Sequence, residues 1–215
     1  MQAYKSQFIF FYLFCFLVFS LNLRGSKTRG ARVISNPDGK SVTICETHQE
    51  VIHMTVERML AKYGDNAPLV FTQHMFAEVN IQRRKLSLHL LTYDNTLEGM
   101  CYKWSDFMMQ NKKLGHCIDG LCSTEGAGDA KAYKVMPENI LMDNIKYVTI
   151  HEIIEIWLYF DDKNDALRGE KRDIDLNHKT PIISKDIRRF GCGYAIDNVS
   201  NTIYVTMRTG SLFSN

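Results

Sequence analysis

Residues 178–215 read HKTPIISKDIRRFGCGYAIDNVSNTIYVTMRTGSLFSN, and this stretch decides the expected fold. Two runs rich in β-branched and aromatic residues, 190–196 and 202–207, flank a short link of turn-forming residues. Such a pattern predicts a terminal β-hairpin. Glycines on both sides of Cys192 leave the backbone uncrowded at the position where this cysteine is expected to reach a partner.

The first 26 residues have the layout of a secretory signal. They contain no acid, carry Lys5 near the start and include the uncharged apolar run 8–21. That run is shorter than the roughly 20 residues that span a membrane, and its flanks are typical of a signal peptide. We therefore expect residues 1–25 to be a signal peptide, cleaved after Ser20 or after Gly25, with a signal anchor as the alternative.

The charge balance excludes some classes of partner. The whole chain carries a formal charge of +2, and removal of the predicted signal takes away Lys5 and Arg24, which leaves a neutral chain. A neutral chain has no electrostatic hold on nucleic acid or on an anionic membrane surface. No nucleic-acid partner is expected, and no membrane span in the mature chain.

The cysteine count fits an oxidising compartment. Two disulfides and one cysteine left over are expected after the signal is removed. Cys192 is expected to pair with Cys117 or Cys122, although spacing alone does not fix the connectivity. Cys101 lies on an apolar helical face and could equally be a free, buried thiol. The five cysteines of the mature chain are Cys45, Cys101, Cys117, Cys122 and Cys192.

The segment before residue 71 is expected to form a small N-terminal appendage. Within residues 26–70, the polar stretch 27–39 predicts a flexible lead-in, 41–45 a short strand and 47–63 a helix that Gly64 ends. Residues 65–68 predict a turn. This appendage has too little apolar surface for a core of its own, so it should pack on the main domain.

Residues 71–215 predict an α+β domain. Apolar periodicity indicates helices over 76–85, around Trp104 and over 148–160, and Pro137 suits the first position of a further helical turn. Helices followed by a terminal hairpin are typical of a layered α+β architecture.

Seven segments within residues 73–207 form a series of motifs. They are EVNIQR at 78–83, LTYDNTL at 91–97, Trp104, PENI at 137–140, Trp157, HKT at 178–180 and GCGYA at 191–195. In this order they resemble the CAP superfamily, which comprises the cysteine-rich secretory, antigen 5 and pathogenesis-related proteins, with Val79 in place of the family's histidine. The resemblance implies a three-layer α-β-α sandwich with a central groove.

The resemblance also implies a cation site in the groove. Its ligands would be His116, Glu138 and His178, and the fourth position, an acid in the family, is Phe160 here. Two histidines and one carboxylate suffice for zinc with water in an open position, so a divalent cation such as zinc is the candidate cofactor. Asp161 lies about 100° further round the helix and is a poor substitute. Without the resemblance, all three residues read as ordinary solvated or helix-terminal groups.

Two further motifs stand outside that site. Residues 151–155, HEIIE, nearly match the zinc-protease motif His-Glu-x-x-His but lack its second histidine. Asn198 begins the sequon Asn-Val-Ser in the predicted hairpin turn, and a secreted chain would carry a glycan there.

The expected function follows from the resemblance. It implies a secreted, non-enzymatic protein, similar in type to the nematode venom allergen-like proteins. Such a protein acts by extracellular binding of a protein partner or of an apolar ligand such as a sterol or fatty acid. The alternative is a metal-dependent hydrolase or protease that uses His116, Glu138 and His178. The sequence does not predict the oligomeric state.

Overall fold

The computed structural model describes residues 32–35, 41–123, 133–168 and 178–213. The predicted signal peptide lies outside these residues. The helices are α2 (His48–Ile52), α3 (Val56–Tyr63), α4 (Ala67–Lys85), α5 (Asn95–Asn111), α6 (Ile150–Arg168) and α7 (Thr180–Ile183). The strands are β1 (Arg32–Ser35), β2 (Ser41–Ile44), β3 (Thr92–Tyr93), β4 (Cys117–Ile118), β5 (Leu121–Cys122), β6 (Tyr133–Val135), β7 (Glu138–Asn144), β8 (Arg189–Asp197) and β9 (Thr202–Leu212).

The terminal hairpin is the centre of the fold, as the sequence predicted. Strands β8 and β9 pair antiparallel over the whole of β8, with Cys192 opposite Met207. Strand β7 adds to the other edge of β9, also antiparallel, and places Glu138 opposite Arg208. The short strand β3 runs parallel to β8, and β6 pairs with the end of β9. The sheet is therefore built on β9 as its shared strand.

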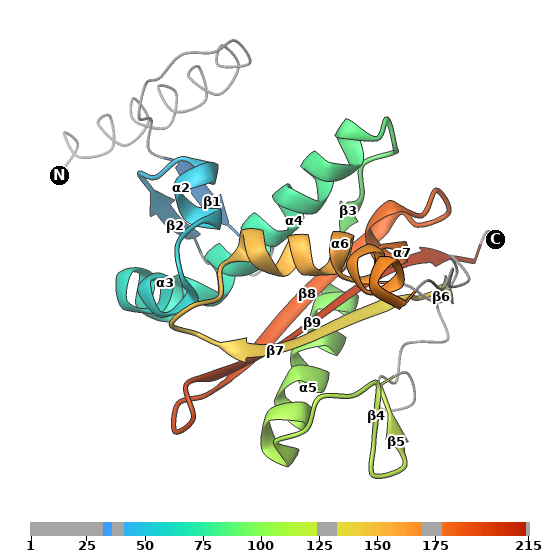
Figure 1. The fold of residues 1–215 in the computed structure, drawn as a ribbon. Helices are drawn as coiled ribbons and strands as arrows, with labels where there is room; N and C mark the ends of the chain where they lie inside the picture. The colour runs from blue at the N-terminus through green and yellow to red at the C-terminus, as the bar shows by residue number, and fades with distance from the viewer. Residues whose placement is uncertain (1–31, 36–40, 124–132, 169–177, 214–215) are drawn as a thin grey trace, which may run out of the picture.

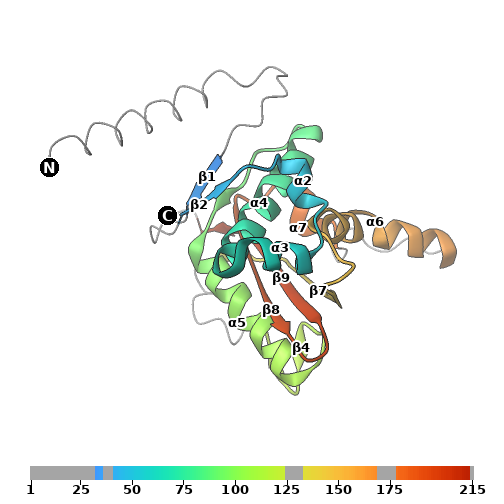
Figure 2. The ribbon, with the colours of Figure 1, turned by 90° about the vertical axis from the view of Figure 1, so that its left-hand side faces the viewer.

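Helices cover both faces of this sheet, which confirms the three-layer sandwich (Figure 1; Figure 2 gives the perpendicular view). Side chains alternate along β9. Val205 and Met207 belong to the cluster that α4 and α6 cover, whereas Tyr204 packs with Trp104 of α5 on the other face. The larger cluster also contains Phe71 and Trp157, both almost fully buried.

Helix α5 approaches the sheet closely because β8 carries glycine at two positions. A Cβ atom at Gly191 would lie 2.3 Å from the backbone nitrogen of Glu98, and one at Gly193 would lie 2.5 Å from that of Tyr102. The glycines therefore make room for a helix backbone. The interpretation that they let Cys192 reach a partner is wrong.

The disulfide also differs from the expected one, which joined Cys192 to Cys117 or Cys122. Cys117 and Cys122 bond to each other across the β4–β5 hairpin, where Asp119 and Gly120 form the turn with positive φ. Cys192 is a free thiol that is fully buried in the sheet. Cys101 is also free and buried, which was the second of the two possibilities left open for it.

The expected appendage shares the core of the main domain. Ile44, Val51, Ile52 and Met59 belong to the same hydrophobic cluster as Phe190 of β8. Backbone hydrogen bonds from Val56 and Glu57 to Val148 and Ile145 fix α3 beside the connection between β7 and α6. Helix α4 runs across residue 70, the predicted boundary of the appendage.

Several local predictions were wrong. The helix expected over 47–63 is two helices, because Thr47 and Thr55 each cap a new helix with their side chains. Residues 65 and 66 belong to a short 3-10 helix, Gly64–Asn66, and helix α4 begins at Ala67 with Pro68 in its first turn. Strand β1 lies within the expected flexible lead-in and pairs with β2. Pro137 starts no helix, since Glu138 begins strand β7.

Candidate functional site

The predicted cation site contains an ion pair inside the protein. Glu138, at the start of β7, faces Arg208 across the β7–β9 pair. The Arg208 guanidinium donates from Nε to Glu138 Oε2 at 2.6 Å, and its Nη2 lies 2.5 Å from the same oxygen. Arg208 is fully buried and the Glu138 side chain is 6% exposed, so solvent screens this pair weakly.

The second carboxylate oxygen of Glu138 is held by the hairpin of β4 and β5. His116 Nδ1 lies 2.8 Å from Glu138 Oε1, and the Ser123 hydroxyl donates to the same oxygen at 2.8 Å. The Cys117–Cys122 disulfide lies between His116 and Ser123 in the chain, and the backbone N–H of Ser123 donates to the His116 carbonyl at 2.9 Å. The hairpin therefore presents both side chains to Glu138 as one unit.

Electrostatics keep Glu138 ionised. Burial raises the pKa of this carboxyl group, but the hydrogen bond from His116, the charge of Arg208 and the hydrogen bond from Ser123 outweigh burial. The net result is a pKa below the ordinary value for a glutamate. The carboxylate is a stable anion whose charge the guanidinium balances.

The structure brings His116 and Glu138 together but does not add His178 to them. The backbone carbonyl of His178 accepts a hydrogen bond from Asn139 Nδ2 at 2.7 Å. Asn139 follows Glu138 in β7, so its side chain points to the other face of the sheet. Within the described ranges, no three His, Cys, Asp or Glu side chains form a group that could hold a metal ion. The side chains of Phe160 and Asp161 lie outside the described part.

These residues do not fit a divalent cation. Both oxygens of Glu138 already accept hydrogen bonds, and a metal at this carboxylate would lie beside the buried positive charge of Arg208. Two like charges at close range in a buried site repel strongly. The buried charge of Arg208 therefore opposes a metal ion at Glu138.

Sequence reasoning missed Arg208, although a signal for it was present. Alternation along the hairpin places residues 204, 206 and 208 on one face, and register with β7 then sets Arg208 against Glu138. An arginine at an inward position of a strand requires an anionic partner. Ser123 had no comparable signal, because its position depends on the geometry of the β4–β5 hairpin.

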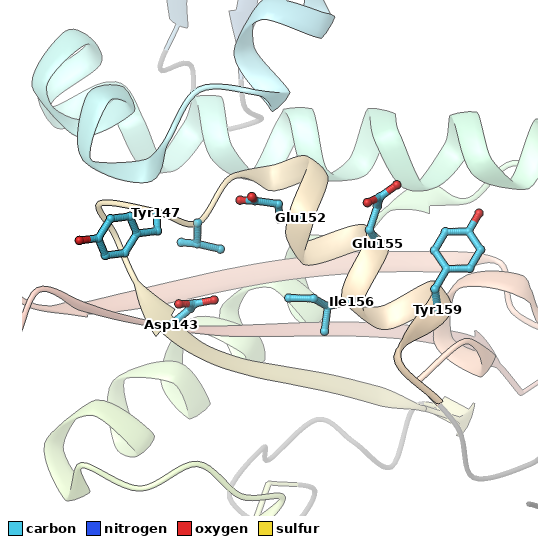
Figure 3. A pocket seen from close by; sticks show the side chains of 7 residues that line it. Asp143, Tyr147, Glu152, Glu155, Ile156 and Tyr159 are labelled. Atoms are coloured by element: carbon cyan, nitrogen blue, oxygen red, sulfur yellow. The ribbon is translucent and has the colours of Figure 1, made fainter. Parts of the chain in front are cut away.

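A separate pocket of about 320 Å³ lies between β7 and α6 (Figure 3). Helix α6 contributes Glu152, Glu155, Ile156 and Tyr159, which repeat at helical spacing on one face. Tyr147 and Tyr159 stand at opposite ends, with the carboxylates between them. The remaining lining residues are Asp143 and Val148. The pocket is acidic, and both rings are largely exposed, at 74% and 48%.

The motif at 151–155 has an ordinary structural role. Glu152 caps α6 by accepting from the backbone and hydroxyl of Thr149 at 2.8 and 3.0 Å. His151 lies 3.5 Å from Glu155, one helical turn away, and its ring packs against His53 of the appendage. Glu152, which would be the general base of a zinc protease, therefore serves as a helix cap.

Asn198 lies at the tip of the β8–β9 hairpin and is exposed, as are Val199 and Ser200 of its sequon. Asp197 organises the tip by accepting from the backbone of Val199 at 2.9 Å and from the Ser200 hydroxyl at 2.8 Å. A glycan at this tip would extend into solvent.

The fold defines the class of protein, an α-β-α sandwich whose sheet is built on a terminal hairpin. The family model for the cysteine-rich secretory protein family, CAP, matches residues 76–208. The chain therefore belongs to the CAP family.

Solved structures agree with this fold. An outer surface protein from Borrelia burgdorferi is 16% identical, with a TM-score of 0.52, 66% of this chain covered and 92% of that chain. An extracellular SCP-domain protein from Bacillus anthracis is also 16% identical, with a TM-score of 0.51 and coverages of 80% and 46%. No curated protein sequence matches the chain. No helix in the described ranges has the length and apolar character to cross a membrane.

Proposed function

We propose that this protein is secreted and acts by binding an extracellular protein partner rather than by catalysis. The observation that carries the proposal is the Arg208–Glu138 ion pair, which places a permanent internal cation where the alternative, a hydrolase, needs a metal. Activation of water by a metal requires an open coordination position. A guanidinium supplies positive charge but offers no such position.

The pocket between β7 and α6 is the surface we assign to the partner. Its three carboxylates, Asp143, Glu152 and Glu155, have no lysine, arginine or histidine among the lining residues. Exposed tyrosine rings beside carboxylates suit a lysine or arginine side chain, which gains both ion pairing and contact with the ring face. A sterol or fatty acid would cover these three carboxylates without adding a positive charge to balance them, which is costly.

Metal analysis of the purified mature protein tests whether the Arg208–Glu138 ion pair takes the place of a metal. We expect less than about 0.1 zinc per chain, and no heat on zinc titration at micromolar concentration. Arg208→Lys is the matched variant, because it keeps the buried positive charge and should remain without zinc. One zinc per chain that is lost in His116→Ala would overturn the proposal and return the hydrolase reading.

Selection of displayed random peptides on the immobilised protein tests the partner surface. We expect enrichment of lysine and arginine, and a loss of affinity of about tenfold for a selected peptide in Glu155→Gln. Asp106→Asn on α5 is the control, since it removes one exposed acid far from the pocket and should change nothing. Equal binding to both variants would refute the pocket, and saturable uptake of labelled sterol or fatty acid would assign an apolar ligand instead.

The proposal includes the signal peptide over residues 1–25 and a glycan on Asn198. Expression of the full chain in a eukaryotic secretory host tests both features. We expect protein in the medium that begins after Ser20 or Gly25 and loses mass on treatment with an N-glycosidase. Asn198→Gln should remove the mass change and leave secretion intact. Retention of the full chain in the membrane fraction would instead identify a signal anchor.

A further inference from the structure

Four of the seven histidines form two pairs around the short helix α2. His48, at the start of α2, contacts His74 of α4. His53, directly after α2, contacts His151 of α6, with ring centroids 4.4 Å apart. Helix α2 rests on both α4 and α6, so each pair joins it to one of the two helices beneath.

The pair of His48 and His74 is a hydrogen bond between two imidazole rings. Their Nδ1 atoms are 2.8 Å apart, the ring planes differ by 9° and the centroids are 5.0 Å apart. The two nitrogens are much closer than the centroids, so the rings meet edge to edge in nearly one plane. One nitrogen must donate and the other must accept across such a contact.

Glu78 fixes the proton count of this pair. His48 Nε2 lies 2.9 Å from Glu78 Oε2, and a carboxylate can only accept, so Nε2 carries a proton. The Glu78 pKa is lowered, chiefly by the hydrogen bond from His48, against burial, which raises it. Gln82 donates to the other oxygen at 2.6 Å, and the charge of Lys85 also lowers the Glu78 pKa. Glu78 therefore stays ionised when histidines gain protons.

The gap between the two Nδ1 atoms holds one proton and has no room for a second. The pair tolerates one positive charge, because an imidazolium at His48 can donate to both Glu78 and His74. When His74 is protonated as well, two N–H groups face each other and two cations lie in contact in a largely buried site, where His74 is 6% exposed. Repulsion at this distance is strong when solvent screens it weakly.

The pair of His53 and His151 adds to the effect in the same direction. Glu155, 3.5 Å from His151 Nε2, can balance one positive charge in this pair. A second charge on His53 has to share that carboxylate. His53 is exposed, so water screens this pair more than the first.

We propose that His48–His74 and His53–His151 form a pH-sensitive latch, which holds α2 on the domain at neutral pH and releases it on acidification. The groups that the structure sets against these histidines are Glu78 on α4, on which Gln82 and Lys85 also act, and Glu155 on α6. Histidine is the side-chain type whose charge changes between pH 7.5 and pH 5.0. Release would expose the buried side chains of Val51 and Ile52.

Hydrogen exchange of the mature protein at pH 7.5 and 5.0 tests the latch. Protection is expressed relative to an unstructured chain at each pH, because intrinsic exchange itself depends on pH. We expect protection of the α2 amides to fall by at least about tenfold at pH 5.0, the effect of a one-unit pKa difference. Helix α5 serves as the internal reference and should not change.

The informative variant is His74→Asn with His53→Phe. Asparagine keeps a hydrogen-bonding atom near the Nδ1 position and phenylalanine keeps the ring contact, but neither can gain a proton. The protection of α2 in this variant should not fall between pH 7.5 and pH 5.0. His89→Asn is the control, because it removes an exposed histidine in the loop after α4 and should respond like the wild type.

Three outcomes would overturn the latch. The first is α2 protection in the wild type that does not depend on pH. The second is a fall in the double variant equal to that of the wild type. If circular dichroism shows that the double variant does not fold at pH 7.5, the single variants His74→Asn and His53→Phe are measured instead. The third outcome is a fall in α2 protection in both single variants equal to that of the wild type. None of these outcomes bears on the partner pocket, so the two proposals fail independently.

Discussion

Arg208 lies directly opposite Glu138 across the β7–β9 pair, and its guanidinium binds the carboxylate that the resemblance assigned to a cation. The same guanidinium donates from Nη2 to the backbone carbonyl of Ser123 at 2.9 Å. Arg208 thus connects β7, β9 and the end of the β4–β5 hairpin. The negative charge of Glu138 is therefore balanced by Arg208 of the same chain.

Removing Arg208 should be costly because it leaves Glu138 buried and without its counter-charge. We expect Arg208→Met to lower the free energy of unfolding by about 3–5 kcal/mol, measured by urea titration at pH 7. Arg208→Lys should cost less, since it keeps the charge and loses only the forked geometry. The double variant Arg208→Met with Glu138→Gln should recover part of the loss. A loss below about 1 kcal/mol in Arg208→Met would show that the pair is screened.

The ion pair should also give the protein a characteristic acid sensitivity. The Glu138 pKa lies below the ordinary value, because the donors around it outweigh burial. A carboxyl with a lowered pKa in the folded state stabilises the protein above the ordinary glutamate value, about 4.3. That stability is lost as the pH falls through the lowered, folded-state pKa.

Unfolding free energy measured from pH 7 to pH 3 checks this sign. The wild type should lose stability at the acid end, and Glu138→Gln should show a shallower decline. Glu78→Gln should also flatten the curve, because the Glu78 pKa is lowered too, with the His48 hydrogen bond as the main cause. Asp106→Asn on α5 serves as a surface control. A steeper acid decline in Glu138→Gln would contradict the assignment.

The sequence predicted the elements whose signal is local and strong. The β-branched runs of the terminal hairpin predicted β8 to within one residue at each end, and the apolar face around Trp104 predicted α5. Strand β9 was predicted to end at residue 207 and continues to Leu212. The sandwich itself came from the family resemblance, since alternation and periodicity do not fix how helices are distributed over a sheet. Asn80 shows why a motif can carry the fold: its amide binds the Leu91 backbone at both donor and acceptor, at 3.2 and 2.7 Å.

The wrong predictions have tertiary causes. Cys117 and Cys122, the two expected partners of Cys192, are bonded to each other instead, because the hairpin turn brings their Cα atoms within 3.9 Å. Pro137 leads into a strand because β9 supplies the pairing edge. The candidate site was predicted only as far as His116 and Glu138 lie together. The His178 backbone is instead held by Asn139, whose Nδ2 donates to the His178 carbonyl.

The close contact of α5 with β8 predicts opposite effects for two glycines. Gly191→Ala would force a Cβ atom to 2.3 Å from the backbone of α5, so the helix must move away from the sheet. We expect a loss of about 3 kcal/mol or more, as for severe overpacking. Gly99→Ala, within α5, meets nothing within 4 Å and should stabilise by about 0.5–1 kcal/mol. Urea titration of both variants checks the pair, and a tolerated Gly191→Ala would contradict the observed helix position.

The cysteine arrangement predicts how many thiols react before and after unfolding. Cys45 is exposed, whereas Cys101 and Cys192 are buried and burial raises the pKa of both thiols, which suppresses the reactive thiolate. A thiol reagent should therefore modify one cysteine in the native mature protein and three after denaturation without reductant. Cys45→Ser should reduce the native count to none. A single reactive thiol after denaturation would instead reveal a second disulfide, as the cysteine count of the sequence first indicated.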